Sequence, residues 1–318
     1  MTTARPVRPT DLVALVSFDG RVYANEAHTW DRLGRRAGAR LLENAFEQWF
    51  SFATGRHTWI SVEGLTIRGL ISARARGSRL AWEVDCLIIA CDERQPTLDA
   101  LVDQLIAAAA GAGTLRVFLR LEAGSAALEA ARALGFMPYV HETLLQLSEP
   151  ASEQPLDQGL SLRKRARADG FALFRLYNAV TPESVRRYEA ATYAEWIAGQ
   201  ERRSQGRGHH DLVAETDGRI VAWLRAVPDG EVGRIDLLLH PDGAAHGPAL
   251  LAHAVGLLGR HRPLYSLVPR YAENLLAMHR EQGFAPVAEF DGLVKRLVTP
   301  IKEAKPVRVP AHQPLATG

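Results

Sequence analysis

The sequence predicts a mixed α+β fold, in which one module of about 150 residues occurs twice and each copy is a mainly antiparallel central sheet flanked by helices. Two internal matches predict the duplication. "EVDCLIIACDE" from Glu83 aligns with "RIDLLLHPDGA" from Arg234 at an offset of 151 residues, and "GFMP" from Gly135 aligns with "GFAP" from Gly283 at an offset of 148. Both matches keep their order and nearly keep their spacing. We therefore expect two tandem copies of one fold.

Each copy is expected to open with a short strand and a first helix, in "VRPTDLVALVSF" after Pro6 and in "SLRKRARADGFALFRLY" after Leu160. Three strand-like runs follow in the first copy, "HTWISVEG", "LTIRGLISARA" and "LAWEVDCLIIA". A helix is expected next, with apolar residues on one face at Leu98, Leu101, Val102, Leu105 and Ile106. Gly111 and Gly113 are expected to end this helix. The strand "LRVFLRL" and a last helix that runs to Gly135 complete the copy.

The second copy repeats this order. Asp217-Gly218 is a favoured hairpin turn between two strands, and Pro228-Asp229-Gly230 turns the chain into "EVGRIDLLLH". The turn in "HPDGAAHGPALLAHAV" leads into a helix with one apolar side. The strand "LYSLV" and a helix that ends before Gly283 follow.

The predicted domain boundaries follow from these elements. We expect a first domain over residues 1–147, a polar, proline-containing linker over 148–159, a second domain over 160–299 and a poorly ordered tail over 300–318.

Composition restricts the class of protein. A net charge of +2 from 38 basic and 36 acidic residues gives no broad field for a polyanion, which argues against nucleic acid as a partner. Cys86 and Cys91 would point to opposite faces of one strand, which favours free thiols in a reducing compartment. No run approaches the roughly 18 apolar residues of a membrane span. We expect a soluble cytoplasmic protein without a membrane partner.

This order of elements resembles the GNAT-type N-acetyltransferase family. The resemblance covers nearly the whole chain as a tandem of two such domains. It implies transfer of an acyl group from acetyl-CoA, or from another acyl-CoA, to an amine of a small molecule or peptide. In tandem proteins of this family one half can carry catalysis while the other has decayed. Whether the chain forms a homodimer stays open.

The family's signature for coenzyme A is an Arg or Gln, two residues, Gly, one residue, then Gly or Ala at a helix start. Successive backbone N–H groups and the positive helix end face the pyrophosphate there. The second copy has "AAHGPA", which keeps Gly247 and Ala249 but has Ala244 at the Arg position and Pro248 without an N–H. The first copy has "CDERQPTLDAL", with no glycine in the turn. We expect the second copy to be the half that binds the cofactor.

The resemblance places the cofactor at the strand end, the turn and the start of the last helix. The expected contacts are Leu238, Leu239, His240, Ala245, His246, Gly247, Ala249, Leu250 and Asn274. The alternative for the turn is close packing, since small residues before a helix are common without any ligand.

The resemblance also implies a carboxylate base on or near the fourth strand. Glu231 and Asp236 are the carboxylates there, and five residues apart they face opposite sides of the strand. Asp85 occupies the place of Asp236 in the first copy, which indicates a repeated structural role. We therefore expect Glu231 to be the base, against the alternative of an exposed surface carboxylate.

The general acid is expected in the last helix. His279 lies four residues before Gly283, where the family has a Tyr, and an imidazole can donate a proton near neutral pH. The alternative is a partly exposed helix histidine. Tyr271, at the start of that helix, is the reserve acid.

Two long insertions follow the first helix of each copy, where the resemblance implies an acceptor-binding wall. Their aromatic residues are Trp30, Phe46, Trp49 and Phe50 in the first and Tyr188, Tyr193 and Trp196 in the second. Packing between the domains is the alternative for this spacing. The histidines have no metal-ligand spacing, so no zinc site is expected. The alternative function is a catalytically inactive tandem that acts as an acyl-CoA sensor or a protein-interaction scaffold, because both cofactor motifs are eroded.

Overall fold

The computed structural model describes residues 3–11, 14–15, 18, 23–34, 55–91, 94–149, 160–200 and 208–297. The strands are β1 (Thr3–Pro6), β2 (Arg56–Glu63), β3 (Thr66–Ala75), β4 (Ala81–Ile89), β5 (Arg116–Glu122), β6 (Met137–Leu147), β7 (Ser161–Lys164), β8 (His210–Thr216), β9 (Arg219–Asp229), β10 (Val232–Leu239), β11 (Leu264–Pro269) and β12 (Ala285–Arg296). The α-helices are α4 (Arg94–Gly111), α5 (Ala126–Ala133), α6 (Gly170–Val180), α7 (Glu183–Glu189), α8 (Tyr193–Gly199), α9 (Gly247–Leu258) and α10 (Glu273–Glu281). Short 3₁₀ helices are η1 (Pro9–Asp11), η2 (Trp30–Arg32), η3 (Arg167–Asp169) and η4 (Pro241–His246). Residues 150–159 of the predicted linker, the predicted tail, and Phe46, Trp49 and Phe50 lie outside the described residues.

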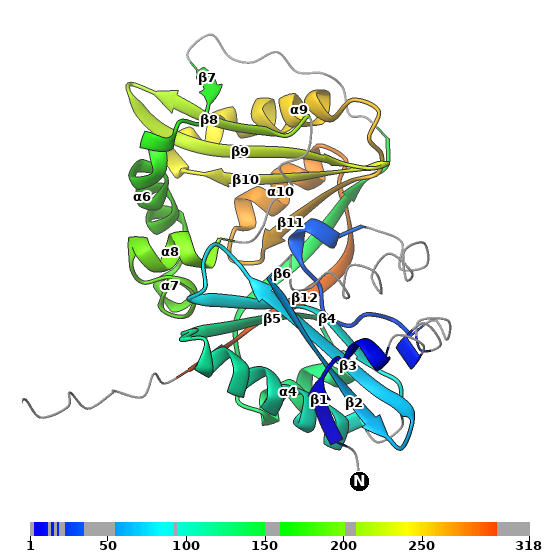
Figure 1. Ribbon diagram of the computed structural model, residues 1–318. Coiled ribbons are helices and arrows are strands. Elements are labelled where there is room, and N and C mark those ends of the chain that lie inside the picture. The colour runs from blue at the N-terminus through cyan, green and yellow to red at the C-terminus, as the bar shows by residue number, and fades with distance from the viewer. Residues whose placement is uncertain are drawn as a thin grey trace, which may run out of the picture.

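The predicted mixed fold with a mainly antiparallel sheet is confirmed, and the two copies share one sheet. Its twelve strands have the order β1-β2-β3-β4-β5-β12-β6-β11-β10-β9-β8-β7 (Figure 1). The last strand of each copy pairs with the other copy: β6 is antiparallel to β11, and β12 is antiparallel to β5. β6 and β12 also pair with each other at the centre. Each half of the sheet is therefore completed by a strand from the other half of the sequence.

Helices cover both faces of the sheet in the second half (Figure 1). The side chains of β9 alternate, because neighbouring residues of a strand point to opposite faces. Ala222 and Leu224 pack in the core that contains Leu250 of α9, whereas Trp223 packs in the core that contains Leu173 of α6. The apolar face predicted for α9 is confirmed, since its five residues are all buried: Leu250, Leu251, Ala254, Val255 and Leu258. These two layers fix β10 and its neighbours in place.

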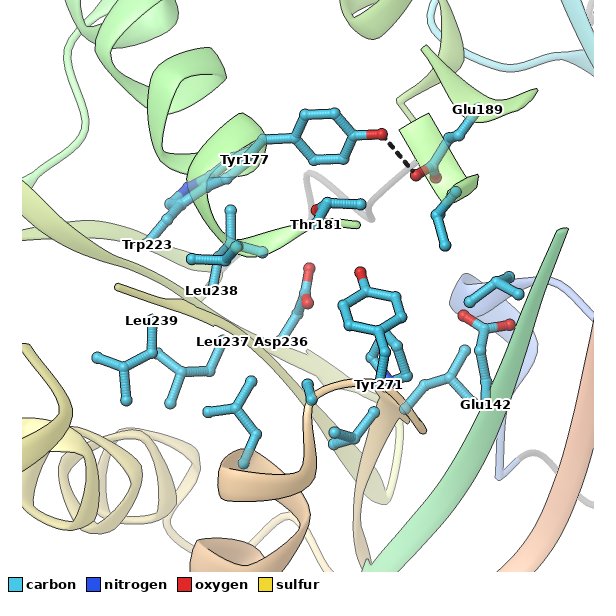
Figure 2. Close-up of a pocket in the computed structure, with 18 of the residues that line it drawn as sticks. Glu142, Tyr177, Thr181, Glu189, Trp223, Asp236, Leu237, Leu238, Leu239 and Tyr271 are labelled. Atoms are coloured by element: carbon cyan, nitrogen blue, oxygen red, sulfur yellow. Dashed lines mark hydrogen bonds between the residues drawn. The ribbon is translucent and has the colours of Figure 1, made fainter. Parts of the chain in front are cut away.

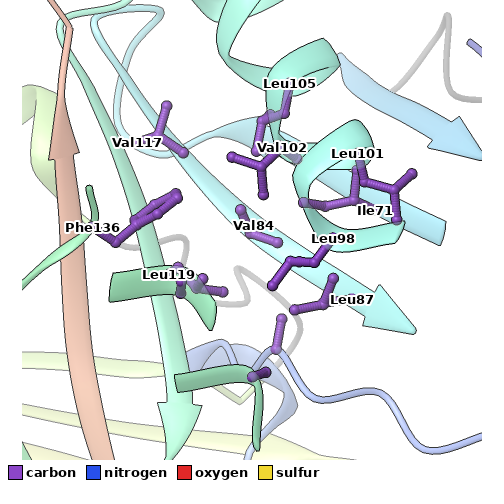
Figure 3. Packing of buried hydrophobic residues seen from close by; sticks show 14 of the residues in the cluster. Ile71, Val84, Leu87, Leu98, Leu101, Val102, Leu105, Val117, Leu119 and Phe136 are labelled. Carbon is purple, nitrogen blue, oxygen red and sulfur yellow. The ribbon is translucent and has the colours of Figure 1, made fainter. Parts of the chain in front are cut away.

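The first half has the same kind of core beneath α4. Leu98, Leu101, Val102 and Leu105 lie on the buried side of this helix, as the spacing predicts. They pack against strand residues that include Ile71, Val84, Leu87, Val117 and Leu119 (Figure 3). Truncation of such a residue to Ala typically costs about 2 to 5 kcal/mol, so this layer is a major source of stability.

Candidate functional site

Two neighbouring strands of the second half separate and leave a cavity between them. β10 and β11 are parallel, and they pair only where residues 233–235 lie opposite residues 264–266. Beyond this point residues 236–239 of β10 and 266–269 of β11 line a cavity of about 490 Å³. We call this gap between β10 and β11 the second wedge.

Both halves of the chain form the walls of the cavity. Its aromatic residues are Trp30, Tyr139, Tyr177, Trp196, Trp223 and Tyr271. Its ionisable residues, besides the tyrosines, are Arg76, Arg120, Glu142, Glu189, Arg225, Asp236 and Glu273. Figure 2 shows Asp236, Tyr271 and Glu142 with their polar ends directed toward the middle of the cavity. An apolar chamber with a few convergent polar groups is the usual form of a small-molecule site.

The equivalent strands of the first half also separate, but the chain itself fills their gap. β4 and β5 are parallel and pair over three residues. The N–H of Glu26 donates to the carbonyl of Leu87 in β4 (2.8 Å), and the N–H of His28 donates to the carbonyl of Arg120 in β5 (2.9 Å). Burial and the charge of Arg120 lower the pKa of His28 to about 4. Segment 25–28 therefore occupies this gap, which we call the first wedge.

Asp85, at the edge of the first wedge, is fully buried among cations. Its carboxylate lies 2.6 Å from Arg56 and accepts a hydrogen bond from the Ser72 hydroxyl (2.6 Å). Burial alone would raise the pKa of Asp85, but the charges of Arg56, Arg32 and Arg74 outweigh it and hold the pKa below its usual range. The side chain of Asp85 serves the structure, since it neutralises these arginines.

Asp236 is the equivalent carboxylate of the second wedge, and its surroundings differ. It pairs with Arg225, whose guanidinium stacks 3.9 Å from the ring centre of Trp223. The Asp236 side chain is 20% exposed and lines the cavity just where β10 leaves β11. A carboxylate at this position is accessible to a ligand, unlike Asp85.

Tyr271 follows β11 and faces Asp236 across the opening (Figure 2). Burial of the hydroxyl and the negative charge of Glu189 raise the pKa of Tyr271 well above its usual value. The phenol therefore stays protonated at neutral pH. It can donate a hydrogen bond or a proton to a group in the cavity.

Two further carboxylates of the cavity are already hydrogen-bonded. Glu189 accepts from the hydroxyl of Tyr177 (3.0 Å), and burial together with Glu189 raises the pKa of that tyrosine. Glu142 accepts from two nitrogens of Arg120 (2.7 and 3.3 Å). Because Glu142 belongs to β6 and Arg120 to β5, this pair brings the first half of the sequence into the wall of the second wedge.

Trp30 also reaches the cavity from the first half. It lies just after the segment that fills the first wedge and is almost fully buried. The next turn is clamped by Arg234 of β10, whose Nε donates to the carbonyl of Leu33 (2.8 Å) and whose Nη1 contacts Asp229 (2.7 Å). One short segment thus fills the first wedge and places an aromatic ring in the second.

Solved structures show the same architecture. No family model and no curated protein sequence matches the chain. Its fold is similar to a GCN5-related N-acetyltransferase from Sphaerobacter thermophilus, with a TM-score of 0.57 and 16% identity over 93% of this chain and 95% of the other. It is similar to a tandem GNAT protein from the clavulanic acid biosynthesis pathway, with a TM-score of 0.56 and 14% identity over 93% and 98% of the two chains. A putative acetyltransferase from Pyrococcus horikoshii gives a TM-score of 0.55 at 12% identity over 94% and 90%.

The chain has the tandem GNAT fold. The two wedges are therefore the corresponding gaps of two GNAT modules, one filled by its own chain and one open.

The turn that was expected to hold the cofactor lies at the end of β10. Leu238 and Leu239 line the second wedge, whereas His240, Ala245 and His246 belong to η4 or its cap and are partly or fully exposed. The remaining turn residues, Gly247, Ala249 and Leu250, are buried in α9 and face the core of this GNAT module. The structure brings only Leu238 and Leu239 of this set, together with Asn274 at the start of α10, to the cavity wall.

Gly247 has a packing reason to be glycine. A Cβ at this position would lie 2.6 Å from the Sδ of Met278 and 2.8 Å from a methyl carbon of Leu239. Both distances are shorter than van der Waals contact, so any larger residue must displace the core. The backbone here has an ordinary helical conformation, with φ at −54°.

The expected catalytic residues are separated by the structure. Tyr271 lines the cavity, whereas Glu231 is exposed in the turn before β10, at the opposite end of that strand from Leu239. His279 is 1% exposed and packs edge-on against Phe284. Its Nδ1 pairs with the carbonyl of Leu275 (2.8 Å), and burial lowers its pKa to about 4. His279 is thus a neutral core residue of α10.

Sequence reasoning missed Glu142, Glu189 and Tyr177 in the cavity wall. Glu142 was out of reach, because only the exchange of β6 brings it beside the second wedge. A signal existed for Arg120: it is a charged residue in the strand "LRVFLRL", which otherwise alternates as a buried strand, and an inward charge there requires a partner.

The described residues form neither a metal site nor a membrane-spanning helix. Among the described residues, no group of three or more His, Cys, Asp or Glu side chains is arranged to hold a metal ion. No helix in the described part of the chain is long and apolar enough to cross a membrane.

Proposed function

We propose that the protein is an acyl-CoA-dependent N-acyltransferase whose second wedge binds acetyl-CoA, or another acyl-CoA, together with an amine acceptor. One observation carries this proposal: the second wedge is open and has the carboxylate of Asp236 and the protonated phenol of Tyr271 on its two sides. The first wedge, filled by segment 25–28, serves as a structural partner.

The second wedge fits the extended arm of an acyl thioester. β11 stops pairing with β10 after residue 235, so an extended chain with amide groups can lie between the two strands and meet their backbone groups. Residues 237–239 and 268–269 would hold this arm. The bound thioester would supply an activated carbonyl carbon for attack by the amine.

Asp236 is the residue best placed to accept a proton from the amine. Its carboxylate lies at the point where the strands diverge, pairs with Arg225 and is partly exposed to the cavity. A positioned carboxylate base typically contributes about 10²- to 10⁴-fold to the rate of such a step.

Tyr271 is the corresponding proton donor. The phenol is protonated at neutral pH, and its hydroxyl lines the cavity, where it can donate to the sulfur that leaves when the acyl group moves. Asp236 lies on β10 and Tyr271 follows β11, so both groups can reach one reaction centre in the opening (Figure 2).

The acceptor is expected to lie against the aromatic part of the cavity. Trp30 and Tyr139 come from the first half of the sequence, and Tyr177 and Trp196 come from the second. Rings from both halves favour an amine on an apolar or aromatic body, which can stack on them. The second GNAT module therefore depends on the first for its acceptor wall.

Calorimetry with acetyl-CoA, followed by thiol release with a panel of amines, tests the proposal. We expect one acetyl-CoA per chain, and we expect Tyr271→Phe to lower turnover about 100-fold with donor affinity within about twofold. His279→Gln, in the adjacent helix, is the matched control and is expected to keep turnover. No binding at millimolar acetyl-CoA would overturn the proposal, and binding without turnover on any amine would favour the sensor.

A further inference from the structure

An acyl-CoA consists of an acyl-pantetheine arm and an adenosine diphosphate. The second wedge fits the arm better than the turn at its mouth, residues 240–247, fits the adenosine diphosphate. The wedge between β10 and β11 offers about 490 Å³ and unpaired strand edges to an acyl-pantetheine arm. The adenosine diphosphate part would have to lie outside, at η4 and the start of α9. A diphosphate is held tightly only where several free N–H groups or cations converge on it.

Several backbone donors of this turn are already in use. The N–H of Asp242 donates to Nδ1 of His240 (3.1 Å), and the N–H of Gly243 donates to the carbonyl of His240 (2.9 Å). The N–H of Gly247 donates within the turn, and Pro248 has no N–H. Three N–H groups of the turn therefore already have acceptors, and the position of Pro248 offers none to an anion.

The charges at the mouth do not favour a diphosphate either. Residues 240–259 contain no Lys or Arg. The exposed carboxylate of Asp242 lies there, 3.3 Å from Nδ1 of His240 and 3.9 Å from Arg219. This carboxylate would repel a diphosphate and balances the nearby charge of Arg219.

Gly247 does not give a diphosphate closer access to the backbone of the turn. Its open side faces Met278 and Leu239 in the core, so the space left by the missing side chain is already filled. A ligand cannot approach the backbone through it.

We propose that the second wedge recognises its donor through the acyl-pantetheine arm, and that pantetheine thioesters without the adenosine diphosphate serve nearly as well as acyl-CoA. This inference rests on the proposed function. In the transfer, the amine nitrogen bonds to the acyl carbon as the carbon–sulfur bond breaks. Asp236 takes the proton that the amine loses, and the pantetheine thiol leaves with the proton of Tyr271.

Calorimetry on the full chain with three probes tests it: acetyl-CoA, S-acetylpantetheine, and adenosine 3′-phosphate 5′-diphosphate. We expect dissociation constants of the two thioesters within about fivefold of each other and no competition by the nucleotide at about 1 mM. A diphosphate held by two charge-assisted hydrogen bonds would contribute about 100-fold or more. S-acetylpantetheine weaker by that factor, or a competing nucleotide, overturns the inference.

Variants at the mouth sharpen the result. Ala244→Arg combined with Asp242→Asn adds a cation and removes the repelling carboxylate, so it should tighten acetyl-CoA about tenfold and leave S-acetylpantetheine unchanged. An unchanged affinity for acetyl-CoA would contradict the account, because the diphosphate would then lie elsewhere. Arg219→Ala is expected to change neither affinity; a selective loss for acetyl-CoA would show that Arg219 holds the diphosphate and would overturn the inference.

The two levels of the proposal fail in different ways. If neither thioester binds, the proposed function itself fails. If acetyl-CoA binds and is consumed while S-acetylpantetheine is not, the function holds and only the inference about the donor is wrong.

Discussion

The first and second wedges are formed by equivalent strands of one repeated module, yet one is filled and the other is open. Segment 25–28 bridges β4 and β5 by backbone hydrogen bonds, whereas β10 and β11 diverge around a cavity lined by both halves. The equivalent carboxylates differ accordingly, since Asp85 is enclosed by arginines and Asp236 faces the cavity. Equivalent strands can thus enclose a segment of their own chain in one half and an open cavity with Asp236 and Tyr271 on its walls in the other.

The largest difference is expected between the effects of substituting Asp236 and Asp85 on turnover and on stability. Asp236→Asn should lower turnover by about 10²- to 10³-fold with a small effect on unfolding, because its side chain is partly exposed. Asp85→Asn should cost about 3 kcal/mol or more of stability, because it removes a fully buried counter-charge that lies 2.6 Å from Arg56, and should keep turnover within a few-fold. Urea unfolding and thiol release measure the two effects. Equal loss of turnover in both variants would break the comparison.

Gly247 and Gly256 test whether the turn of the second wedge is a packing feature. Gly247→Ala should lower the free energy of unfolding by about 1 to 3 kcal/mol, because its Cβ would lie too close to Met278 and Leu239. Gly256→Ala in the same helix has open space around its Cβ and should stabilise by up to about 1 kcal/mol. Thermal unfolding of the pair checks the prediction, which is wrong if both substitutions have the same sign.

Each half has a histidine whose pKa is lowered to about 4, His28 in the first wedge and His279 in α10. An unfolded histidine titrates near 6.5, so the unfolded state binds the proton first and stability falls as the pH drops from about 7 toward 4. For His279 the loss is about 2 kcal/mol by pH 5. His279→Gln should flatten the pH dependence of urea unfolding between pH 7 and 5. An unchanged slope would show that this histidine is not buried as a neutral group.

The smallest effect is expected for substitution of Asn25, whose side chain links segment 25–28 to β4 in the first wedge. Its Oδ1 accepts from the N–H groups of Leu87 (2.8 Å) and Ala27 (3.0 Å). Asn25→Ala should cost about 1 to 2 kcal/mol of stability without creating a second donor site. Calorimetry should still find one acetyl-CoA per chain; two would mean that the first wedge is closed only by this side chain.

The repeated patterns of the sequence determined most of the fold. The two strand-like runs around the Asp217-Gly218 turn and the apolar faces of α4 and α9 are local signals, and the structure has each element where they predict it. Asp217 and Gly218 both have positive φ, 51° and 73°, which explains the preference for this pair in the turn. The order of elements within each copy predicted the tandem GNAT fold in the same way, because residues close in the chain determine each element.

The candidate site was decided by tertiary structure. Glu142 enters the second wedge only because β6 is exchanged between the halves, and Trp30 does so only because its segment crosses from one half to the other. Spacing placed His279 on α10 but could not show that it is buried in the core. It assigned Glu231 to the strand, whereas this residue is exposed in the turn before β10. Local sequence sets the direction and period of each strand and helix, whereas accessibility and charge depend on what packs against it from distant parts of the chain.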